Sequence, residues 1–277
     1  MPYMFNSKPI NALKNQYYFR SALLLLLSFI SINVSAQKLK VIAYNIEFAK
    51  STSVDEMYSF LKSQKADVIC FSEVPAQGWT KKLGDLLGMD YSFEGKTASA
   101  NHMEDYKDKT GKYYGKYKSI LSKYPLEKPH EVLLEGDRWS PAGAVVASVK
   151  VSKRRSVMVF SLHIPTGIDN PKKSKAFYLA QILKNDYSSY DRVILAGDFN
   201  DRYDSEPMKY LYDLGFKNPY KSLNIDLSHS TTLSREENNG KVIDHILYKD
   251  LKVKKAGIIE QRSLSDHKPI WAVFKLK

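Results

Sequence analysis

The stretch VILAGDFN, residues 193–200, decides the fold class of this sequence. Its apolar and small residues predict a buried β-strand, and the strand runs into Asp198 and Asn200, polar residues that a buried strand does not need. In an open α/β sheet, ligands bind beyond the carboxyl ends of the strands, because the loops there converge on a crevice. We therefore expect Asp198 and Asn200 to belong to a site at a sheet edge.

Polar residues also follow the other strands that the sequence predicts. They are Asn45 and Glu47 after residues 39–44, Glu73 after 67–72, and His163 after 157–162. Two further pairs, Asp244-His245 and Asp266-His267, add carboxylates and imidazoles. Each residue alone is explained by an ordinary strand exit, in which polar side chains hydrogen-bond the backbone. Their joint occurrence favours one shared site, from which we leave out His245 because neighbours on a strand face opposite sides.

Short β-type runs alternate with helical patterns, which predicts an α/β architecture. The predicted strands are residues 39–44, 67–72, 144–151, 157–162, 193–197, 243–248 and 271–276. Helices are expected from the capping box Ser53–Glu56, from Asn170-Pro171, and from Ser205-Glu206-Pro207 to Gly215. Residues 98–118, with five lysines and four tyrosines but no apolar period, predict an exposed loop, and Lys153-Arg154-Arg155 a solvated hairpin turn.

The first 36 residues have the order of a secretory signal peptide. Three cations precede an apolar stretch over residues 21–34, and Val34-Ser35-Ala36 offers small residues for cleavage. The rival interpretation is an uncleaved membrane anchor, but the apolar stretch is shorter than the ~20 residues of a spanning helix. We predict cleavage after Ala36, a secreted or periplasmic protein, and one mature domain over residues 37–277.

The mature chain is predicted to be strongly basic. The net charge is +12, and removal of three cations and no anion leaves 12 − 3 = +9. A basic exported protein favours polyanions such as nucleic acid, anionic lipid headgroups or glycans, although charge does not select among them. The single cysteine, Cys70, lies in an apolar run and predicts a buried core residue rather than a catalytic thiolate. No protein partner is indicated, and we expect a monomer.

The residue types at the strand ends predict the chemistry. Carboxylate and carboxamide oxygens suit Mg²⁺, with Mn²⁺ or Ca²⁺ as alternatives, whereas zinc prefers imidazole or thiolate. Mg²⁺ commonly takes one or two protein carboxylates, so Glu73 with Asn45 or Asp266 would suffice. Such a cation points to phosphate chemistry, in which the cation and imidazolium groups offset transition-state charge. Motifs of serine hydrolases, P-loop proteins, dinucleotide-binding proteins and zinc proteases are absent from the sequence.

Seven short segments of the sequence occur in an order and with a spacing that are also found in a known protein family. They are VIAYNIE at 41–47, ADVICFSEV at 66–74, SILSKYP at 119–125, SLH at 161–163, GDFN at 197–200, IDHI at 243–246 and SDHKP at 265–269. Together they resemble the endonuclease/exonuclease/phosphatase superfamily, which includes exonuclease III, pancreatic-type deoxyribonuclease, neutral sphingomyelinases and inositol polyphosphate phosphatases. The resemblance covers nearly the whole mature chain. It implies a deoxyribonuclease I-like, four-layer α/β sandwich, in which two facing mixed β-sheets are flanked by helices around one metal-dependent site.

The resemblance also implies a metal site. Glu73 matches the main metal ligand, and Asn45 and Asp266 match contributing residues. Glu47 falls where relatives of exonuclease III carry an acidic metal-site residue.

Five further residues match the catalytic positions of the superfamily. Asp198 would orient or deprotonate the attacking water, and Asn200 would hold that water or a phosphate oxygen. His267, supported by Asp244, would bind the scissile phosphate and stabilise its charge. His163 corresponds to a histidine of the deoxyribonuclease branch, which makes it a candidate leaving-group acid.

The loops depart from the deoxyribonuclease branch, because we find no counterpart of the glutamate that partners its first histidine, of its DNA-contacting arginine or of its disulfides.

The leading hypothesis is a secreted, Mg²⁺-dependent nuclease that cleaves phosphodiester bonds of DNA or RNA, since the tyrosines and lysines of residues 98–118 suit bases and phosphates. The alternative is a sphingomyelinase-like phosphodiesterase that touches a membrane surface, or a phosphatase on inositol or sugar phosphates. A catalytically silent polyanion-binding protein is the non-enzymatic alternative, but such a protein has no need of the complete set of acids, amides and imidazoles.

Overall fold

Two β-sheets face each other in the computed structural model, which describes Met1 and residues 37–75, 78–98, 116–136, 142–165, 170–237 and 239–276. Lys38–Lys277 cluster as one unit. The predicted signal peptide, apart from Met1, lies outside the described residues, as does most of the predicted loop 98–118. Among the helices of the described ranges, none has the length and apolar character that a membrane span requires.

The first sheet has six strands in the order β10-β11-β1-β2-β4-β3. Their bounds are β1 Lys38–Asn45, β2 Val68–Val74, β3 Tyr91–Glu94, β4 Tyr117–Ser122, β10 Lys252–Ile258 and β11 Ile270–Lys275. β1 and β2 run parallel, whereas the other neighbours are antiparallel. The central parallel pair therefore sends two chain segments out at the same edge of the sheet.

The second sheet has five strands in the order β5-β6-β7-β8-β9. Their bounds are β5 Leu126–Leu133, β6 Gly143–Ser152, β7 Arg155–His163, β8 Val193–Asp198 and β9 Asp244–Lys249. β7 and β8 are its parallel pair, and β9 returns antiparallel to β8. The predicted hairpin turn is confirmed at Lys153 and Arg154, while Arg155 begins β7.

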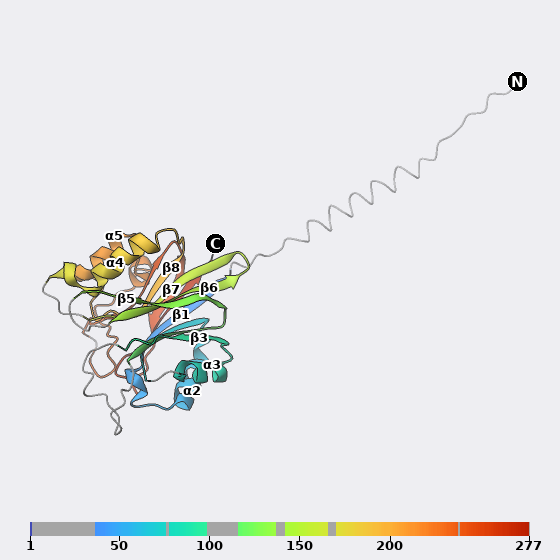
Figure 1. Ribbon diagram of the computed structural model, residues 1–277. Coiled ribbons are helices and arrows are strands. Elements are labelled where there is room, and N and C mark those ends of the chain that lie inside the picture. The colour runs from blue at the N-terminus through green and yellow to red at the C-terminus, as the bar shows by residue number, and fades with distance from the viewer. Residues whose placement is uncertain are drawn as a thin grey trace. The chain divides into compact units, whose positions relative to one another are not determined.

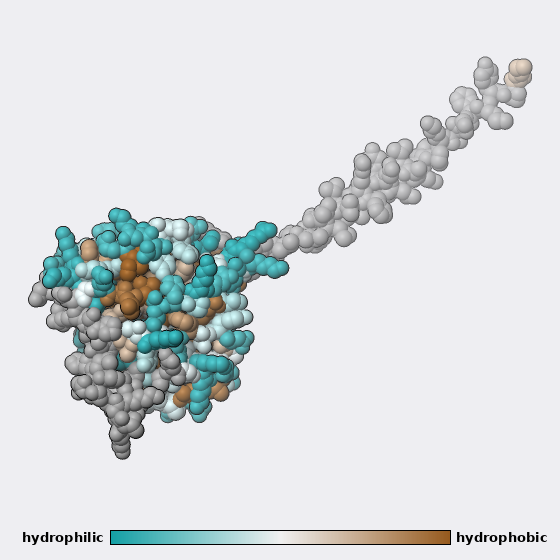
Figure 2. All heavy atoms as spheres, viewed as in Figure 1, coloured by the Kyte–Doolittle hydropathy of each residue, from teal (hydrophilic) through white to brown (hydrophobic). Residues whose placement is uncertain are grey.

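Helices cover the outer face of each sheet, so that the chain forms four layers (Figure 1). α2 (Val54–Gln64) and α3 (Trp79–Leu87) pack on the first sheet, and α4 (Lys175–Asp186) and α5 (Glu206–Asp213) on the second. The short elements are η1 (Glu47–Ala49), η3 (Pro171–Lys173) and α6 (Pro219–Ser222). The predicted four-layer sandwich is confirmed, and Figure 2 shows the coloured part of its visible surface as mostly hydrophilic, with the largest hydrophobic area near α4.

The central core fills the space between the sheets with small and β-branched side chains. It includes Val41 and Cys70 from the first sheet and Val145, Ile194 and Ile246 from the second. Cys70 is fully buried, and burial raises the pKa of its thiol, as expected of a core residue. The burial of these apolar faces holds the strands in register, because a shift by one residue would turn each core side chain to the opposite face of the sheet.

The predicted helix starts are confirmed with two local differences. Ser53 and Glu56 form the reciprocal capping box of α2, an interaction of about 1 kcal/mol. Asn170 caps only the short turn η3, and Ser174 caps α4 anew. Ser205 occupies the N-cap of α5, but its hydroxyl makes no capping hydrogen bond.

The prediction of an exposed loop over residues 98–118 is wrong at its C-terminal end. Tyr117 and Lys118 begin β4, and Lys118 is fully buried with its ammonium donating to the Thr97 carbonyl oxygen at 2.9 Å. Burial lowers the pKa of Lys118 to about 8. A lysine in a buried strand hides the apolar pattern on which the sequence prediction depends.

Candidate active site

The predicted site residues converge where the two parallel strand pairs end. In the second sheet His163 lies beside Asp198, and Asp198 lies opposite Asp244. Two serines tie this edge to the first sheet: the Ser72 hydroxyl donates to the Leu162 carbonyl at 2.7 Å. The Ser161 hydroxyl donates to the Phe71 carbonyl at 3.0 Å. These reciprocal bonds fix the residues that follow, Glu73 and His163, across the gap between the sheets.

Asp198 is the central carboxylate of this cluster. Its Oδ2 accepts from Asn45 Nδ2 at 3.0 Å, and its Oδ1 accepts from the Asn200 backbone N–H at 2.8 Å. The same Oδ2 lies 3.5 Å from His163 Nε2 and 3.7 Å from His267 Nε2. Burial, and then the Asp244 charge, raise the pKa of Asp198 to about 7, a value suited to a group that takes and returns a proton near neutral pH.

Asp244 and His267 form a buried pair on the other side of Asp198. His267 Nδ1 lies 2.8 Å from Asp244 Oδ2, a charge-assisted contact that fixes the ring orientation. Burial lowers the pKa of His267, but the charges of Asp244 and Asp198 outweigh it and raise that pKa to about 10. His267 is therefore an imidazolium at neutral pH, facing Asp198 through its Nε2.

Glu73 sits in a strained bulge at the end of β2. Its φ is +55°, and the register between β2 and β4 shifts between Phe71 and Val74. Its Oε1 lies 3.6 Å from Lys116 Nζ and 3.6 Å from His163 Nε2. Burial raises the pKa of Glu73, although the Lys116 charge opposes this. Strained backbone of this kind costs free energy and persists chiefly at functional sites.

His163 is buried between the two carboxylates, Glu73 and Asp198. Burial, followed by the charges of Lys118 and Lys116, lowers its pKa well below the usual value. The ring is thus neutral at neutral pH and acts there as a hydrogen-bonding group.

Glu47 and Asp266 lie at the border of the cluster. The Glu47 backbone N–H donates to Asn45 Oδ1 at 3.1 Å, while its carboxylate pairs with Arg235 at 2.7 Å. Asp266 is anchored by its carbonyl, which accepts from the Ser234 N–H at 2.7 Å. Sequence reasoning named both acids but missed Arg235, for which a position in a loop gave no signal.

The side chains of Asn200 and His245 lie in different surroundings, although both residues are close in sequence to catalytic candidates. Asn200 adopts a φ of +52° and donates through Nδ2 to the Ile164 carbonyl at 3.0 Å, so it borders the site. His245 packs on Phe199, and its Nε2 lies 2.7 Å from the Asp201 carbonyl. His245 therefore contacts Phe199 and Asp201, and its omission from the candidate site stays a prediction.

The donor set fits a hard divalent cation. The Asn45 side chain and the Asp266 charge both act on the Glu73 carboxylate, so three hard oxygen donors lie near one another. Asp198, Asp244 and His267 also come within 4.8 Å of one another, but the protonated His267 offers no lone pair to a cation. Asp244 Oδ1 is buried without a hydrogen-bond partner in the described part of the chain. Glu73, Asn45 and Asp266 would supply the hard oxygen ligands that Mg²⁺ prefers. Lys116 would compete with such a cation for the Glu73 carboxylate, from which its Nζ lies 3.6 Å away. Sequence reasoning missed Lys116, although its spacing of two from Lys118 could have placed both on one face of a strand.

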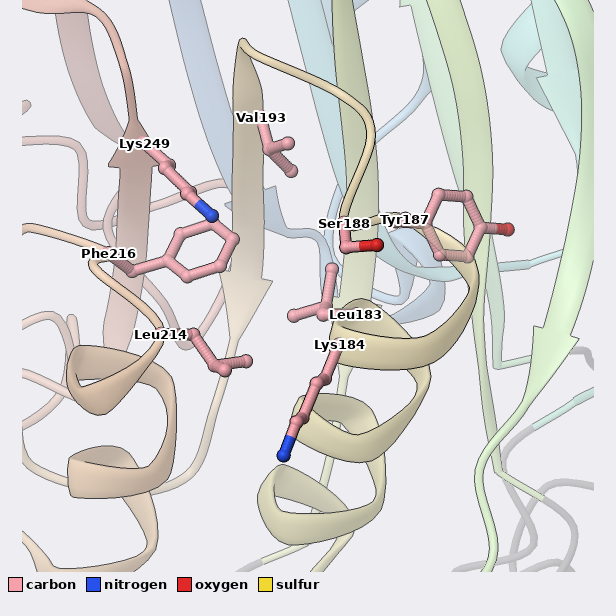
Figure 3. A pocket seen from close by; sticks show the side chains of 8 residues that line it. All are labelled: Leu183, Lys184, Tyr187, Ser188, Val193, Leu214, Phe216 and Lys249. Carbon is pink, nitrogen blue, oxygen red and sulfur yellow. The ribbon is translucent and has the colours of Figure 1, made fainter.

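A cavity of about 100 Å³ elsewhere in the fold is separate from this cluster (Figure 3). Its described lining is mainly apolar, with Leu183, Val193, Leu214 and Phe216 between α4 and the neighbouring segments. None of the candidate site residues lines it. We interpret it as a gap in helix packing.

The sequence over residues 42–267 matches the Endonuclease/Exonuclease/phosphatase family. The chain belongs to this family. Its fold is similar to a family protein from Beutenbergia cavernae, with 16% identity, a TM-score of 0.68, and coverage of 87% of this chain and 72% of that one. No curated protein matches the sequence.

Two further solved structures of the same fold carry more specific names. One is a mannosyl-6-phosphatase from Bacteroides thetaiotaomicron, with 15% identity, a TM-score of 0.66, and coverage of 86% of this chain and 100% of that one. The other is the catalytic domain of human Nocturnin, with 18% identity, a TM-score of 0.64, and coverage of 87% and 95%. At these identities the likeness concerns the fold, and family membership makes the chain a phosphoesterase of this superfamily.

Proposed function

We propose that this family member hydrolyses phosphoester bonds by metal-assisted attack of water. The observation that carries the proposal is the position of Asp198, buried between the imidazoles of His163 and His267 with a pKa of about 7. Such a carboxylate can accept a proton from water at neutral pH, whereas an ordinary exposed aspartate is a much weaker base.

Each neighbour of Asp198 has a role in this reaction. Asn45 and Asn200 orient the carboxylate through the two hydrogen bonds described above, so that water binds on its free side. The water oxygen forms a bond to phosphorus as the bond between phosphorus and the alcohol oxygen breaks. The His267 imidazolium, held by Asp244, binds the phosphate oxygens on which charge accumulates.

Asp198 takes up one proton of the attacking water, and the leaving alcohol oxygen takes one proton from solvent. The proton on Asp198 then passes to solvent, so the net reaction consumes one water and restores the carboxylate. His163 lies beside Asp198 as a neutral imidazole, and its Nε2 can donate a hydrogen bond to the leaving oxygen. When bound, Mg²⁺ would supply charge compensation for the phosphate, with Glu73, Asn45 and Asp266 as its holders.

Nucleic acid is the first substrate class that we propose. The net charge of +9 after removal of residues 1–36 supports it, because lysines and arginines attract the phosphate backbone. The corresponding assay incubates the chain from Gln37 onward with single-stranded and duplex DNA and RNA in Mg²⁺. If all four substrates stay intact while a small phosphoester is cleaved, the nuclease assignment is wrong and the phosphoesterase assignment stands.

Small polar phosphoesters are the second candidate class, and a different observation supports them. A cavity of about 550 Å³, lined mostly by polar and charged residues, adjoins Asn200, and its size suits a compact alcohol better than a long strand. The mannosyl-6-phosphatase of the same fold is named for a sugar phosphate, so a substrate of this class is compatible with the fold.

Substitution Asp198→Asn tests the hydrolytic mechanism. We expect loss of turnover by about 10²–10⁴-fold with unchanged folding, the usual contribution of a general base. Asp250→Asn is the matched control, because Asp250 is exposed in the turn after β9, beyond the end of that strand opposite to Asp244. Activity that survives in Asp198→Asn, or in full in the presence of a chelator, would contradict the proposal.

We also propose that the chain is exported and processed after Ala36. Expression in a bacterial host should yield a mature protein whose mass corresponds to a start at Gln37, in the periplasm or medium. A cytoplasmic product that retains Met1 would show that the proposed leader is not used.

A further inference from the structure

The cavity that adjoins Asn200 is lined mostly by polar and charged residues, and apart from Asn200 none of them takes part in the mechanism above. It has a volume of about 550 Å³, within the range of roughly 300–1,000 Å³ of small-molecule sites. Its lining comes from the loop after β8 and from the segment before β9. The residues that carry the inference are Asn200, Arg202, Asp204, Ser205, Asn239 and Lys241.

Both lining segments lead directly out of the catalytic residues. Asp198 ends β8 and Asp244 begins β9, and the two lie opposite each other. The next hydrogen bond joins Phe199 N–H to the Ile243 carbonyl at 3.0 Å. Asn200, which binds Asp198 through its backbone, also lines the cavity. A substrate with its phosphate at Asp198 can therefore extend into this space.

The wall before β9 is fixed by local hydrogen bonds. The Lys241 carbonyl accepts from Thr231 Oγ1 at 3.0 Å and from the Thr232 N–H at 3.2 Å. Its own N–H donates to Asn239 Oδ1 at 3.0 Å. Gly240 has a φ of +75°, and a Cβ at this position would lie 3.1 Å from the Ser228 carbonyl oxygen and 3.8 Å from an Arg202 guanidinium nitrogen. The wall is thus formed before any ligand binds.

Among the described residues, the two cations of the cavity pair with exposed carboxylates. Arg202 Nε lies 3.3 Å from Asp204, and Lys241 Nζ lies 3.0 Å from Glu236, with all four side chains substantially exposed. Exposed ion pairs of this kind contribute little to stability, so both cations can turn to a ligand at small cost.

The residue types of the lining favour a polar ligand. Ser205 Oγ is buried, does not cap α5 and has no hydrogen-bond partner in the described part of the chain, so its hydroxyl can bond a ligand only if its side chain rotates toward the cavity. The described lining otherwise consists of carboxylates, amides and cations, with Ile243 as its apolar member and without an aromatic ring on which a base could stack.

We propose that this cavity binds the alcohol part of the substrate as a polyhydroxylated ring, a sugar or a cyclitol. Carboxylates accept from ring hydroxyls, amides both donate and accept, and Arg202 with Lys241 bind hydroxyl oxygens or a further anionic substituent. This inference rests on the proposed phosphoester hydrolysis and narrows its substrate class.

The test compares Arg202→Met and Lys241→Met with Arg154→Met, an exposed control in the turn between β6 and β7. The substrates are myo-inositol 1-phosphate, D-glucose 6-phosphate and p-nitrophenyl phosphate, whose alcohol is not a polyol. For at least one polyol phosphate, we expect KM to rise about tenfold or more in both cavity variants, and by more than for p-nitrophenyl phosphate. The control should keep the wild-type KM values, and the polyol with the larger rise identifies a sugar or a cyclitol.

Calorimetric titration of the same polyol phosphates in chelator separates this inference from the proposed function. Binding that is lost in both cavity variants supports the subsite even if turnover is absent, an outcome that would reject only the hydrolase. Turnover of p-nitrophenyl phosphate with neither binding nor cleavage of the polyol phosphates overturns the subsite alone. An equal rise of KM for all three substrates, or cleavage confined to an oligonucleotide, also overturns it.

Discussion

Removal of the Asp244 charge tests the electrostatic basis of the proposed site most directly. In Asp244→Asn, His267 keeps a neighbour of the same shape but loses its nearest carboxylate, 2.8 Å away. The folded protein raises the pKa of His267 from 6.5 to about 10, which corresponds to about 5 kcal/mol in favour of the imidazolium. Asp244 is the first of the charges that raise it, so about half of this value, roughly 2–3 kcal/mol, should depend on that carboxylate.

The expected loss of kcat/KM follows from the same free energy. If the imidazolium stabilises the transition state to this extent, kcat/KM should fall roughly 30- to 150-fold at pH 7.5, because about 1.4 kcal/mol corresponds to a factor of ten. The assay uses bis(p-nitrophenyl) phosphate in saturating Mg²⁺, with Asp250→Asn as the control. An NMR titration of His267 in chelator, where no cation competes, should show the pKa falling from about 10 to roughly 8 in Asp244→Asn, because 2–3 kcal/mol corresponds to roughly two pKa units.

Stability should change with pH in a defined direction. The pKa of His267 is about 10 in the folded protein and 6.5 in the unfolded chain, so protonation of His267 favours the folded state. This stabilisation is complete below pH 6.5 and is lost as the pH rises through about 10. The difference in unfolding free energy between wild type and Asp244→Asn, measured by urea denaturation in chelator, should therefore be largest at pH 6 and shrink toward pH 10. A His267 pKa that stays near 10 in the variant, together with kcat/KM within threefold of wild type, would refute the role of Asp244.

Three further substitutions address the metal, the strand geometry and the excluded histidine. Glu73→Gln should raise the Mg²⁺ concentration for half-maximal activity by about tenfold or more, and an unchanged metal titration would remove Glu73 from the site. Gly197→Ala should lower the free energy of unfolding, measured by urea denaturation, by more than about 3 kcal/mol. The added Cβ would lie 2.0 Å from the Leu162 carbonyl oxygen, and the φ of +144° is unfavourable for alanine. A loss below about 1 kcal/mol would contradict this steric argument. His245→Gln should lower stability by about 1–3 kcal/mol through its bond to the Asp201 carbonyl, while kcat/KM stays within about threefold; a larger kinetic loss would place His245 in the reaction.

The sequence pattern predicts the interior strands of this fold better than its edges. β1, β2, β6, β7 and β8 have neighbours on both sides, and their continuous apolar runs were predicted. β3, β5 and β10 are edge strands and were not, whereas the fourth edge strand, β9, is buried and apolar and was predicted. β5 has the sequence LEKPHEVL, is largely exposed and contains Pro129, so it lacks the alternation that indicates a strand. β10 is likewise polar and bulged.

One interior strand, β4, and two helices, α3 and α6, were not predicted, for different reasons. Lys118 interrupts the apolar run of β4, as described above. α3 begins at a glycine without a side-chain cap, and α6 has only four residues, so neither carries a clear start signal. In each case tertiary packing outweighs a weak local preference.

The candidate site was predicted in its residue types but not in its supports. Asp198, His163 and Glu73 follow apolar strands, and that position makes a polar residue conspicuous in the sequence. Ser72 and Ser161, which tie the two sheets together, lie inside such strands and look like ordinary small residues. Their partners are 90 residues away along the chain, and no local pattern records a pairing of that range.

The difference between strand ends and loops also separates the residues that carry out the reaction from those that select the substrate. Residues that activate water must sit at fixed strand ends, because a carboxylate and an imidazole have to meet within hydrogen-bonding distance, and strands provide that rigidity. The cavity beside them is lined by Arg202 and Lys241, which lie in loops where cations are common and usually mean only solvation. Only the pairing of β8 with β9 brings these two loops face to face. Loop substitutions can therefore change the alcohol that is bound while Asp198 and His267 stay in place, which is how one phosphoesterase core can serve different substrates.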